Sequence, residues 1–136
     1  MYLVYEPEGA EEPQRWKYNP KRLMSVERED LERRTGRDYS DFAKGVMAGN
    51  SLCRRALLYT FLRREHPKTR WEDVDFAWDE LKLEYSKSEY EHMRTEALAN
   101  LHGDELAVAL QQIDKELETA FDDTEESGKA GLPIVA

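Results

Sequence analysis

Cysteine, proline and glycine are scarce in this chain of 136 residues, which contains one Cys, five Pro and seven Gly. So few turn-forming residues disfavour a sandwich or barrel, and the single Cys53 excludes an internal disulfide. We interpret Cys53 as a small buried thiol, because it lies within an apolar helical run. The composition therefore favours an all-α fold class.

Long apolar runs and catalytic motifs are also missing. Nowhere do about 18 apolar residues follow one another, as a membrane-spanning helix requires, and the N-terminal MYLVYEPE lacks the basic and apolar regions of a signal peptide. The chain has no Gly-rich phosphate loop and no nucleophile elbow. We predict a protein that is not an enzyme, has no cofactor, does not bind membranes and acts in the cytoplasm.

Two acidic patterns approach the spacing of a metal site but lack essential parts of it. Glu89 and His92 share a helix face, as in di-iron bundles, yet no second pair of this kind occurs. The carboxylates of residues 73–84 mimic a calcium loop, but Trp78 stands where the sharp turn of that loop demands Gly. We therefore expect no metal ion.

Charge is plentiful but unevenly distributed. Charged residues make up 36% of the chain, and the net charge is −9. Residues 1–71 carry 15 basic against 11 acidic residues, whereas residues 72–136 carry five against 18. An acidic half repels phosphate and anionic lipid and favours basic or apolar partners. We expect no nucleic-acid partner, although the basic cluster at 54–70 leaves a DNA-binding regulator as an alternative.

Residues 50–67, NSLCRRALLYTFLRREHP, predict a buried helix at the centre of the fold. Asn50 or Ser51 can cap its start, and Pro67 ends it. From residue 56 to residue 62 only Thr60 is polar, so the apolar surface runs nearly all the way round the helix. We expect a helix over about 51–66 that other elements wrap. The predicted structural core consists of Leu57, Leu58, Tyr59, Phe61, Leu62, Trp71, Phe76 and Trp78.

The other segments predict a small β-hairpin within residues 1–18 and further helices after it. The helical patterns cover 25–34, 39–48, 76–85, 87–101 and 104–121. Together they predict one compact domain over 1–121, in which the core helices occupy 25–101. The remaining residues, 122–136, read as a flexible acidic tail.

The last predicted helix carries a narrow apolar stripe flanked by charge. Its residues recur at spacings of four, three, four and four: Leu106, Leu110, Ile113, Leu117 and Phe121. This pattern is close to a coiled-coil seam. A stripe of this kind most often packs in a protein's own core, and self-association or docking of another protein's helix are the alternatives. We treat these five residues as candidates for protein interaction.

Five segments follow one another in a recognisable order over roughly residues 15–90. They are WKYNP at 16–20, SVEREDLERRTG at 25–36, DYSDF at 38–42, ALLYTFLRREHP at 56–67 and RWEDVDFAWDELKLE at 70–84. In this order they resemble the tail assembly chaperones of long-tailed bacteriophages, particularly those of actinobacterial hosts. The motif consists of structural residues, so it identifies no contact residue.

This resemblance implies a small helical protein that is made in the cytoplasm of the infected bacterium. Such a protein binds the very long tape-measure protein, keeps it soluble, recruits tail-tube subunits and is absent from the finished virion. A longer product is often made in that family by ribosomal frameshifting, and the codons of residues 127–129, Ser-Gly-Lys, can spell a slippery heptamer. A small helical structural or connector protein that stays in the phage particle is the alternative.

Overall fold

The computed structural model describes residues 1–123 and divides into two compact units. The first unit comprises Tyr2–Leu83, and the second begins at Glu84 and includes Met1. Two compact units do not exclude one cooperatively folding domain, so the single domain over 1–121 stays a prediction. From residue 124 on, the predicted acidic tail and its frameshift codons lie outside the described residues.

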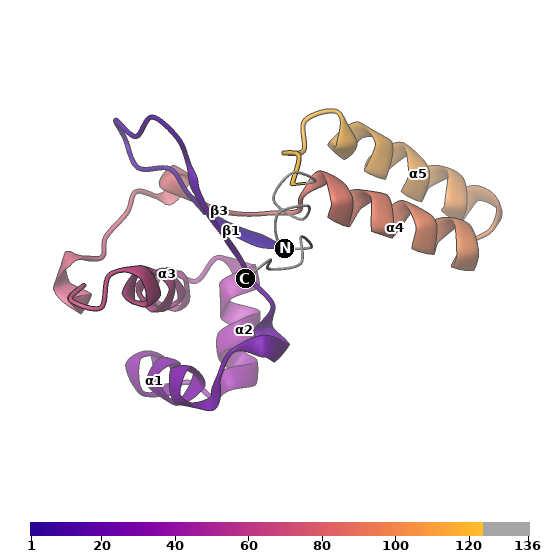
Figure 1. Cartoon of the computed structure of the whole chain (residues 1–136). Helices are drawn as coiled ribbons and strands as arrows, with labels where there is room; N and C mark the ends of the chain where they lie inside the picture. Colours follow the sequence, from indigo (N-terminus) through magenta and orange to yellow (C-terminus); the bar gives the residue numbers. More distant parts are fainter. Residues whose placement is uncertain (124–136) are drawn as a thin grey trace, which may run out of the picture. The chain divides into compact units, whose positions relative to one another are not determined.

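Figure 1 shows the elements in chain order. They are β1 (Tyr2–Tyr5), β2 (Gln14–Lys17), η1 (Pro20–Arg22), α1 (Ser25–Thr35), α2 (Tyr39–Ala48), α3 (Ser51–Glu65), η2 (Trp71–Asp73), η3 (Trp78–Glu80), β3 (Leu81–Glu84), α4 (Lys87–Asn100) and α5 (Gly103–Leu117), where η marks a 3-10 helix. Gly36 and Gly49 end α1 and α2 in left-handed backbone conformations, which glycine adopts without steric cost.

The strands form one sheet in the order β2-β1-β3. β1 and β2 are antiparallel, with Leu3 opposite Trp16 and Val4 opposite Arg15. Tyr2, Leu3 and Val4 are all buried, so both faces of the central strand are covered. The β-hairpin within residues 1–18 is therefore part of a larger sheet.

The predicted all-α class is wrong, because residues 81–84 form a strand and not the end of a helix. Residues 76–85 place apolar side chains at helical spacing, but the structure has only the short η3 turn there. The sequence Leu-Lys-Leu-Glu at 81–84 also alternates with a period of two, which fits a strand. Pairing with β1 decides between the two readings, and the described fold is a mainly helical mixture of α and β.

Glu80 fixes the turn that leads into β3. Its carboxylate accepts hydrogen bonds from the backbone N–H groups of Ala77 and Glu8, both at 2.6 Å. Its backbone carbonyl accepts the N–H of Glu6 at 2.8 Å. These contacts connect the end of β1 to the start of β3, although more than 70 residues separate them in the sequence.

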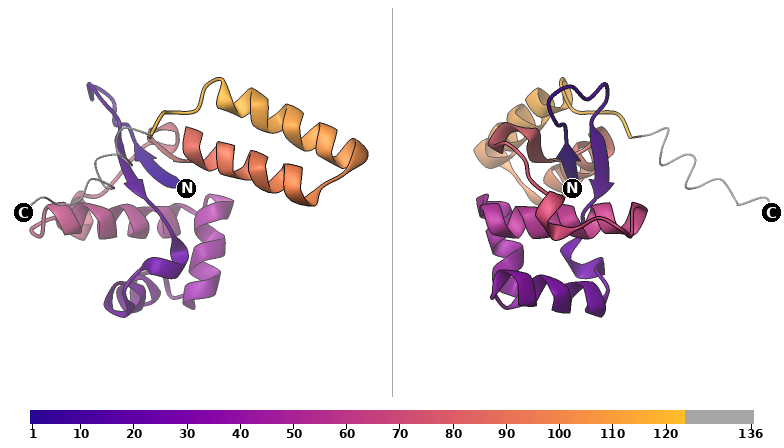
Figure 2. Two further views of the ribbon diagram at one scale, coloured as in Figure 1. Left: turned by 45° about the vertical axis from the view of Figure 1, so that its right-hand side comes forward. Right: turned by 90° about the vertical axis from the view of Figure 1, so that its left-hand side faces the viewer.

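α3 is the buried centre of the first unit. Figure 2 shows the sheet on one side of α3 and α1 on the other. Asn50 caps α3, since its side chain accepts the N–H of Cys53 at 3.0 Å. Phe61 stacks on Trp16 with ring centroids 5.8 Å apart, which joins the helix to β2. Seven residues of α3 are buried: Cys53, Ala56, Leu57, Leu58, Tyr59, Thr60 and Phe61.

Seven of the eight predicted core residues are buried or half-buried. Leu57, Leu58, Tyr59 and Phe61 are buried, and Leu62, Trp71 and Phe76 are half-buried.

Trp78 does not belong to the core, because 68% of its surface is exposed. The Trp78 ring lies over the backbone at Gly49, where an added Cβ would be 2.8 Å from the ring. The Arg54 guanidinium lies 5.6 Å from the ring centroid, so Trp78 covers a helix corner and does not fill an interior space.

Candidate protein-interaction surface

The second unit contains α4 and α5, which lie side by side in Figures 1 and 2 and are called the helical hairpin below. Ser86 caps the start of α4 (Lys87–Asn100) as part of a capping box with Glu89. Its hydroxyl accepts the N–H of Glu89 at 3.3 Å, and the Glu89 carboxylate accepts the N–H of Ser86 at 2.9 Å. α5 begins at Gly103, whose φ of 60° turns the chain sharply, and Asp104 lies in the first turn of the helix.

Asp123 closes the open end of the helical hairpin. This residue is buried, and its carboxylate accepts hydrogen bonds from the Ser88 N–H at 3.2 Å and the Ser88 hydroxyl at 2.7 Å. Burial raises the pKa of Asp123, but hydrogen bonds from Ser86 and Ser88 outweigh this effect and hold the pKa below its usual value. The Phe121 carbonyl accepts the Lys87 N–H at 2.8 Å. The segment after α5 is thereby fixed to the start of α4.

α5 is shorter than predicted and ends at Leu117, so Phe121 lies outside the helix. Its carbonyl bonds to Lys87, a contact between distant residues that local helical periodicity could not reveal. The remaining stripe residues, Leu106, Leu110, Ile113 and Leu117, are called the α5 stripe below.

The helical hairpin has a poorly filled core. The α5 stripe and Phe121 are only half-buried, and α5 contains no buried residue at all. In α4 the one buried residue is Ala97. Isolated helices of about 15 residues are marginal in water and gain most of their stability from packing. The α5 stripe therefore retains apolar surface that a further element could cover.

Two large apolar side chains of the helical hairpin are more exposed than the α5 stripe. Leu98 on α4 is 50% exposed, and Val108 on α5 is 66% exposed. Val108 lies two positions after Leu106, which is about 200° round the helix and hence on the far side from the α5 stripe. Leu98 directly follows buried Ala97, so it lies on the flank of the seam between the helices. Sequence reasoning missed Leu98, because it falls outside the stripe pattern.

Arg94 identifies the flank on which Leu98 lies. Arg94 is one turn before Leu98, and its Nε donates to the Asp114 carboxylate on α5 at 3.0 Å. The same flank carries Glu91, one turn before Arg94, and Glu118, one turn after Asp114. The Glu91 and Glu118 side chains are exposed, and neither carboxylate has an ion pair or hydrogen bond among residues 1–123.

The two units differ strongly in charge. Residues 2–83 carry 16 basic and 16 acidic residues, whereas residues 84–123 carry three basic and 11 acidic ones. The first unit is therefore neutral overall, whereas the second unit is strongly acidic. The negative potential of the second unit attracts basic partners and repels anionic ones.

The basic cluster at 54–70 is largely used in internal contacts. The Arg54 Nε donates to the Val46 carbonyl at 2.9 Å. Arg55 donates to the carbonyls of Val74 at 2.6 Å and Trp71 at 2.8 Å, and its guanidinium lies 4.1 Å from the Trp71 ring centroid. These arginines hold the loop after α3 and the corner before it.

Two further arginines of this cluster form ion pairs. Arg64 makes two hydrogen bonds of 2.7 Å to Glu27 on α1, and Arg70 pairs with Asp73 at 2.9 Å. Arginines that are already paired have less capacity to neutralise phosphate. The contacts therefore weigh against a DNA-binding role for the cluster.

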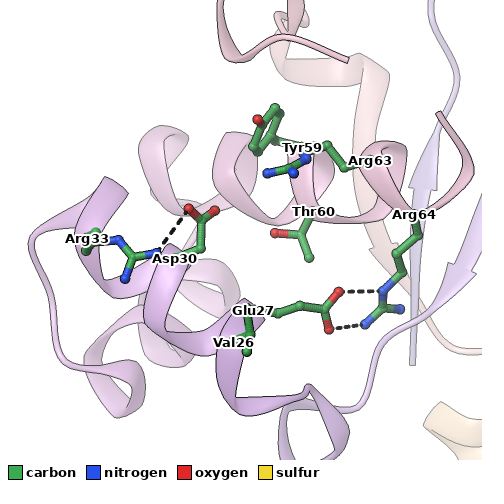
Figure 3. A pocket seen from close by; sticks show the side chains of 8 residues that line it. All are labelled: Val26, Glu27, Asp30, Arg33, Tyr59, Thr60, Arg63 and Arg64. Carbon is green, nitrogen blue, oxygen red and sulfur yellow. Dashed lines mark hydrogen bonds and ion pairs between the residues drawn. The ribbon is translucent and has the colours of Figure 1, made fainter. Parts of the chain in front are cut away.

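A pocket of about 350 Å³ lies between α1 and α3 in the first unit (Figure 3). Its lining consists of Val26, Glu27, Asp30 and Arg33 from α1 and Tyr59, Thr60, Arg63 and Arg64 from α3. Figure 3 shows that four of the charged groups in its lining pair with one another, Arg64 with Glu27 and Arg33 with Asp30. The fifth, Arg63, lies 5.4 Å from the centroid of the Tyr59 ring.

Residues 1–123 contain no cluster of three or more His, Cys, Asp or Glu side chains that could hold a metal ion. The Glu89 carboxylate accepts the N–H of Ser86 and pairs with the N-terminal ammonium of Met1. The His92 Nε2 lies 3.7 Å from the Glu96 carboxylate. Within this same range, no helix is long and apolar enough to cross a membrane.

No protein-family model, curated protein or solved structure matches the chain. The acidic helical hairpin and the resemblance noted for residues 15–90 therefore carry the functional proposal. Those residues correspond to the chain from β2 to the first turn of α4.

Proposed function

We propose that this chain is a phage tail assembly chaperone that binds the tape-measure protein and keeps it soluble before the tail forms. The observation that carries the proposal is the helical hairpin, an acidic pair of helices whose apolar stripe is only half-buried. A holding protein must offer apolar surface to its client and still repel other copies of itself, and an acidic rim around an apolar strip meets both needs.

The first unit has a different role in this proposal. Its buried α3, its sheet and its internally paired arginines make it a stable support with no net charge. The resemblance runs mainly through this unit, and it supports the recruitment of tail-tube subunits as a second activity. We place the protein in the cytoplasm of the infected host and outside the mature virion.

Co-expression tests the proposal directly. Fragments of the tape-measure protein from the same phage are produced with and without this chain, and the soluble fraction is measured. We expect soluble fragment and its co-purification with the chain. A fragment that stays equally insoluble in both cases, and never co-purifies, would remove the chaperone function.

Two further measurements separate this function from the alternatives. A connector protein persists in purified phage particles, whereas a chaperone is absent from them, so mass spectrometry of particles distinguishes the two. A DNA-binding regulator gives a gel shift that weakens steeply with salt, because its binding depends on phosphate contacts. We expect neither the particle signal nor the gel shift.

A further inference from the structure

We propose that the helical hairpin docks an amphipathic helix in which Lys and Arg flank the apolar stripe, and that this helix completes a three-helix bundle with α4 and α5. The inference deepens the proposed function, on which it rests for the identity of the partner, by stating the chemistry of the bound segment and the flank that receives it. This receiving flank consists of Leu98, the half-buried α5 stripe, Glu91 and Glu118.

The shape of the helical hairpin selects a helix as the occupant. α4 has 14 residues and α5 has 15, so they are about 21 Å and about 22 Å long at 1.5 Å per residue. Two helices that pack side by side leave a groove along the line where they meet, and a third helix can pack into this groove. A helix has no free row of backbone donors and acceptors, so a strand could not extend this unit as it extends a sheet edge.

The apolar content shows where the docked helix lies. Covering the receiving flank would bury Leu98 and the remaining exposed surface of the α5 stripe at the same time. Val108 would stay in water, because it lies on the far side of α5 from this seam. Its exposure of 66%, against 50% for Leu98, gives the experiment a matched internal control.

The charges identify the flanking residues of the partner. Glu91 on α4 and Glu118, which directly follows α5, are exposed, lie on the receiving flank and have no ion-pair or hydrogen-bond partner for their carboxylates among residues 1–123. Arg94 on the same flank is already neutralised by Asp114. Basic residues on both sides of a docked apolar stripe would therefore meet one carboxylate on α4 and one at the end of α5.

A second copy of this chain is disfavoured as the occupant. Each copy brings 11 acidic and three basic residues in positions 84–123, so face-to-face pairing would juxtapose like charges. Like charges across an interface oppose association and suppress wrong partners. A basic helix gains from the same field that a second copy would have to overcome.

The test uses the full chain and three fluorescein-labelled peptides of 21 residues. The first is an amphipathic helix with Leu at positions spaced by three and four and with Lys and Arg elsewhere. The second replaces every basic residue by Glu, and the third keeps the charge and replaces every Leu by Gln. Fluorescence anisotropy should show that the first peptide binds at least about tenfold more tightly than either of the others.

Substitutions then assign the surface. Leu98→Gln should weaken binding of the first peptide about fivefold to tenfold, and Val108→Gln should leave it unchanged. The pair Glu91→Gln and Glu118→Gln should weaken binding and flatten its salt dependence, because fewer charge contacts are then screened. The matched pair Asp104→Asn and Glu105→Gln should have little effect. All six residues are exposed, and circular dichroism verifies that each variant folds.

Three outcomes would overturn the inference: equal binding of the basic and acidic peptides, no effect of Leu98→Gln, or a dimer in light scattering that this substitution dissociates. Failure of the proposed function looks different. If the basic peptide binds at Leu98 but no tape-measure fragment co-purifies, the docking surface stands and the chaperone function fails. If a tape-measure fragment co-purifies equally well with the Leu98→Gln chain, the function stands and this surface is wrong.

Discussion

Gly45 in α2 lies directly against Cys53 in α3. A Cβ added at Gly45 would be 2.6 Å from the Cys53 Sγ and 3.4 Å from its Cβ. Both residues are buried, and burial raises the pKa of the Cys53 thiol. The absence of a side chain at position 45 is therefore what lets the two helices approach this closely, and the thiol fills the remaining space.

Gly45→Ala should destabilise the protein through this contact. Overpacking of a close helix crossing costs about 1–3 kcal/mol, which exceeds the gain of up to about 1 kcal/mol that Ala gives within a helix. The double variant with Cys53→Ala removes the clashing sulfur and should recover part of the loss. Urea midpoints of both variants check this coupling, with Lys44→Ala as the exposed neighbour control. Additive losses in the double variant would mean that the contact is not the cause.

The core position of α3 leads to a second prediction. Leu58→Ala should lower the free energy of unfolding by about 2–5 kcal/mol and Phe61→Ala by about 3–5 kcal/mol, since both side chains are fully buried. Leu52 on the same helix is 40% exposed, so Leu52→Ala should cost clearly less. Thermal unfolding of the three variants gives the comparison. Equal midpoints for all three would show that α3 is peripheral.

Tyr18 and Tyr39 provide a contrasting pair of hydroxyl groups. The Tyr18 hydroxyl is buried with no hydrogen-bond partner among residues 1–123, and burial raises the pKa of Tyr18 far above its usual value. The Tyr39 hydroxyl donates to the Pro20 carbonyl at 2.6 Å. A buried polar group without a partner carries an uncompensated desolvation cost, whereas a bonded one contributes about 1 kcal/mol.

Tyr18→Phe should therefore leave stability unchanged or raise it by up to about 1 kcal/mol, and Tyr39→Phe should lower it by about 1 kcal/mol. Chemical unfolding of the two variants in parallel measures the difference. A marked loss in Tyr18→Phe would reveal that the hydroxyl has a partner, such as a buried water.

The elements of the first unit differ in how well the sequence alone predicts them. Local signals placed α1, α2 and α3 close to their observed bounds, because apolar spacing, the glycines that end α1 and α2, and the Asn50 cap of α3 act over a few positions. β3 could not be predicted in the same way, since its four residues fit two periodicities and its partner, β1, is far away in the sequence. The exposure of Trp78 likewise depends on a tertiary contact, because its ring lies against Gly49 between α2 and α3, which are distant from it in the sequence.

The candidate surface was predictable only in part. The α5 stripe follows from helical spacing, but spacing alone does not show that no residue of α5 is buried. Leu98 and the carboxylates Glu91 and Glu118 belong to one flank because of how α4 packs on α5, which is a tertiary relationship. The hydrogen bond from Arg94 on α4 to Asp114 on α5 shows which sides of the two helices form that flank.

The ion pair between Glu27 and Arg64 predicts a dependence of stability on pH. Hydrogen bonds from the Arg64 guanidinium, together with its charge, hold the pKa of Glu27 below its usual value, although burial acts in the opposite direction. As pH falls, the unfolded chain binds the proton first. The stabilisation is therefore complete above the ordinary pKa of glutamate and is lost as pH falls through the lower folded pKa.

Glu27→Gln should cost up to about 1 kcal/mol at neutral pH, because the pair is partly exposed and screened. The difference in urea midpoint between native and Glu27→Gln chains should shrink as the solution is acidified. Glu29→Gln on the same helix is the control and should show no such trend. A difference that stays constant with pH would assign the effect to packing.

Asp123 gives the last prediction, which concerns the end of the helical hairpin. Its buried carboxylate accepts two hydrogen bonds from Ser88 in the first turn of α4, where helix N–H groups otherwise lack partners. Asp123→Ala should lower stability by about 1–2 kcal/mol, as the loss of an N-terminal cap does. It should also speed hydrogen exchange at the Ser88 amide, which loses its acceptor, while amides in the middle of α3 keep their protection. Glu118→Ala removes an exposed carboxylate five residues earlier and should change neither quantity. Unchanged exchange at Ser88 in the Asp123→Ala chain would show that the capping box of Ser86 and Glu89 holds the start of α4 by itself.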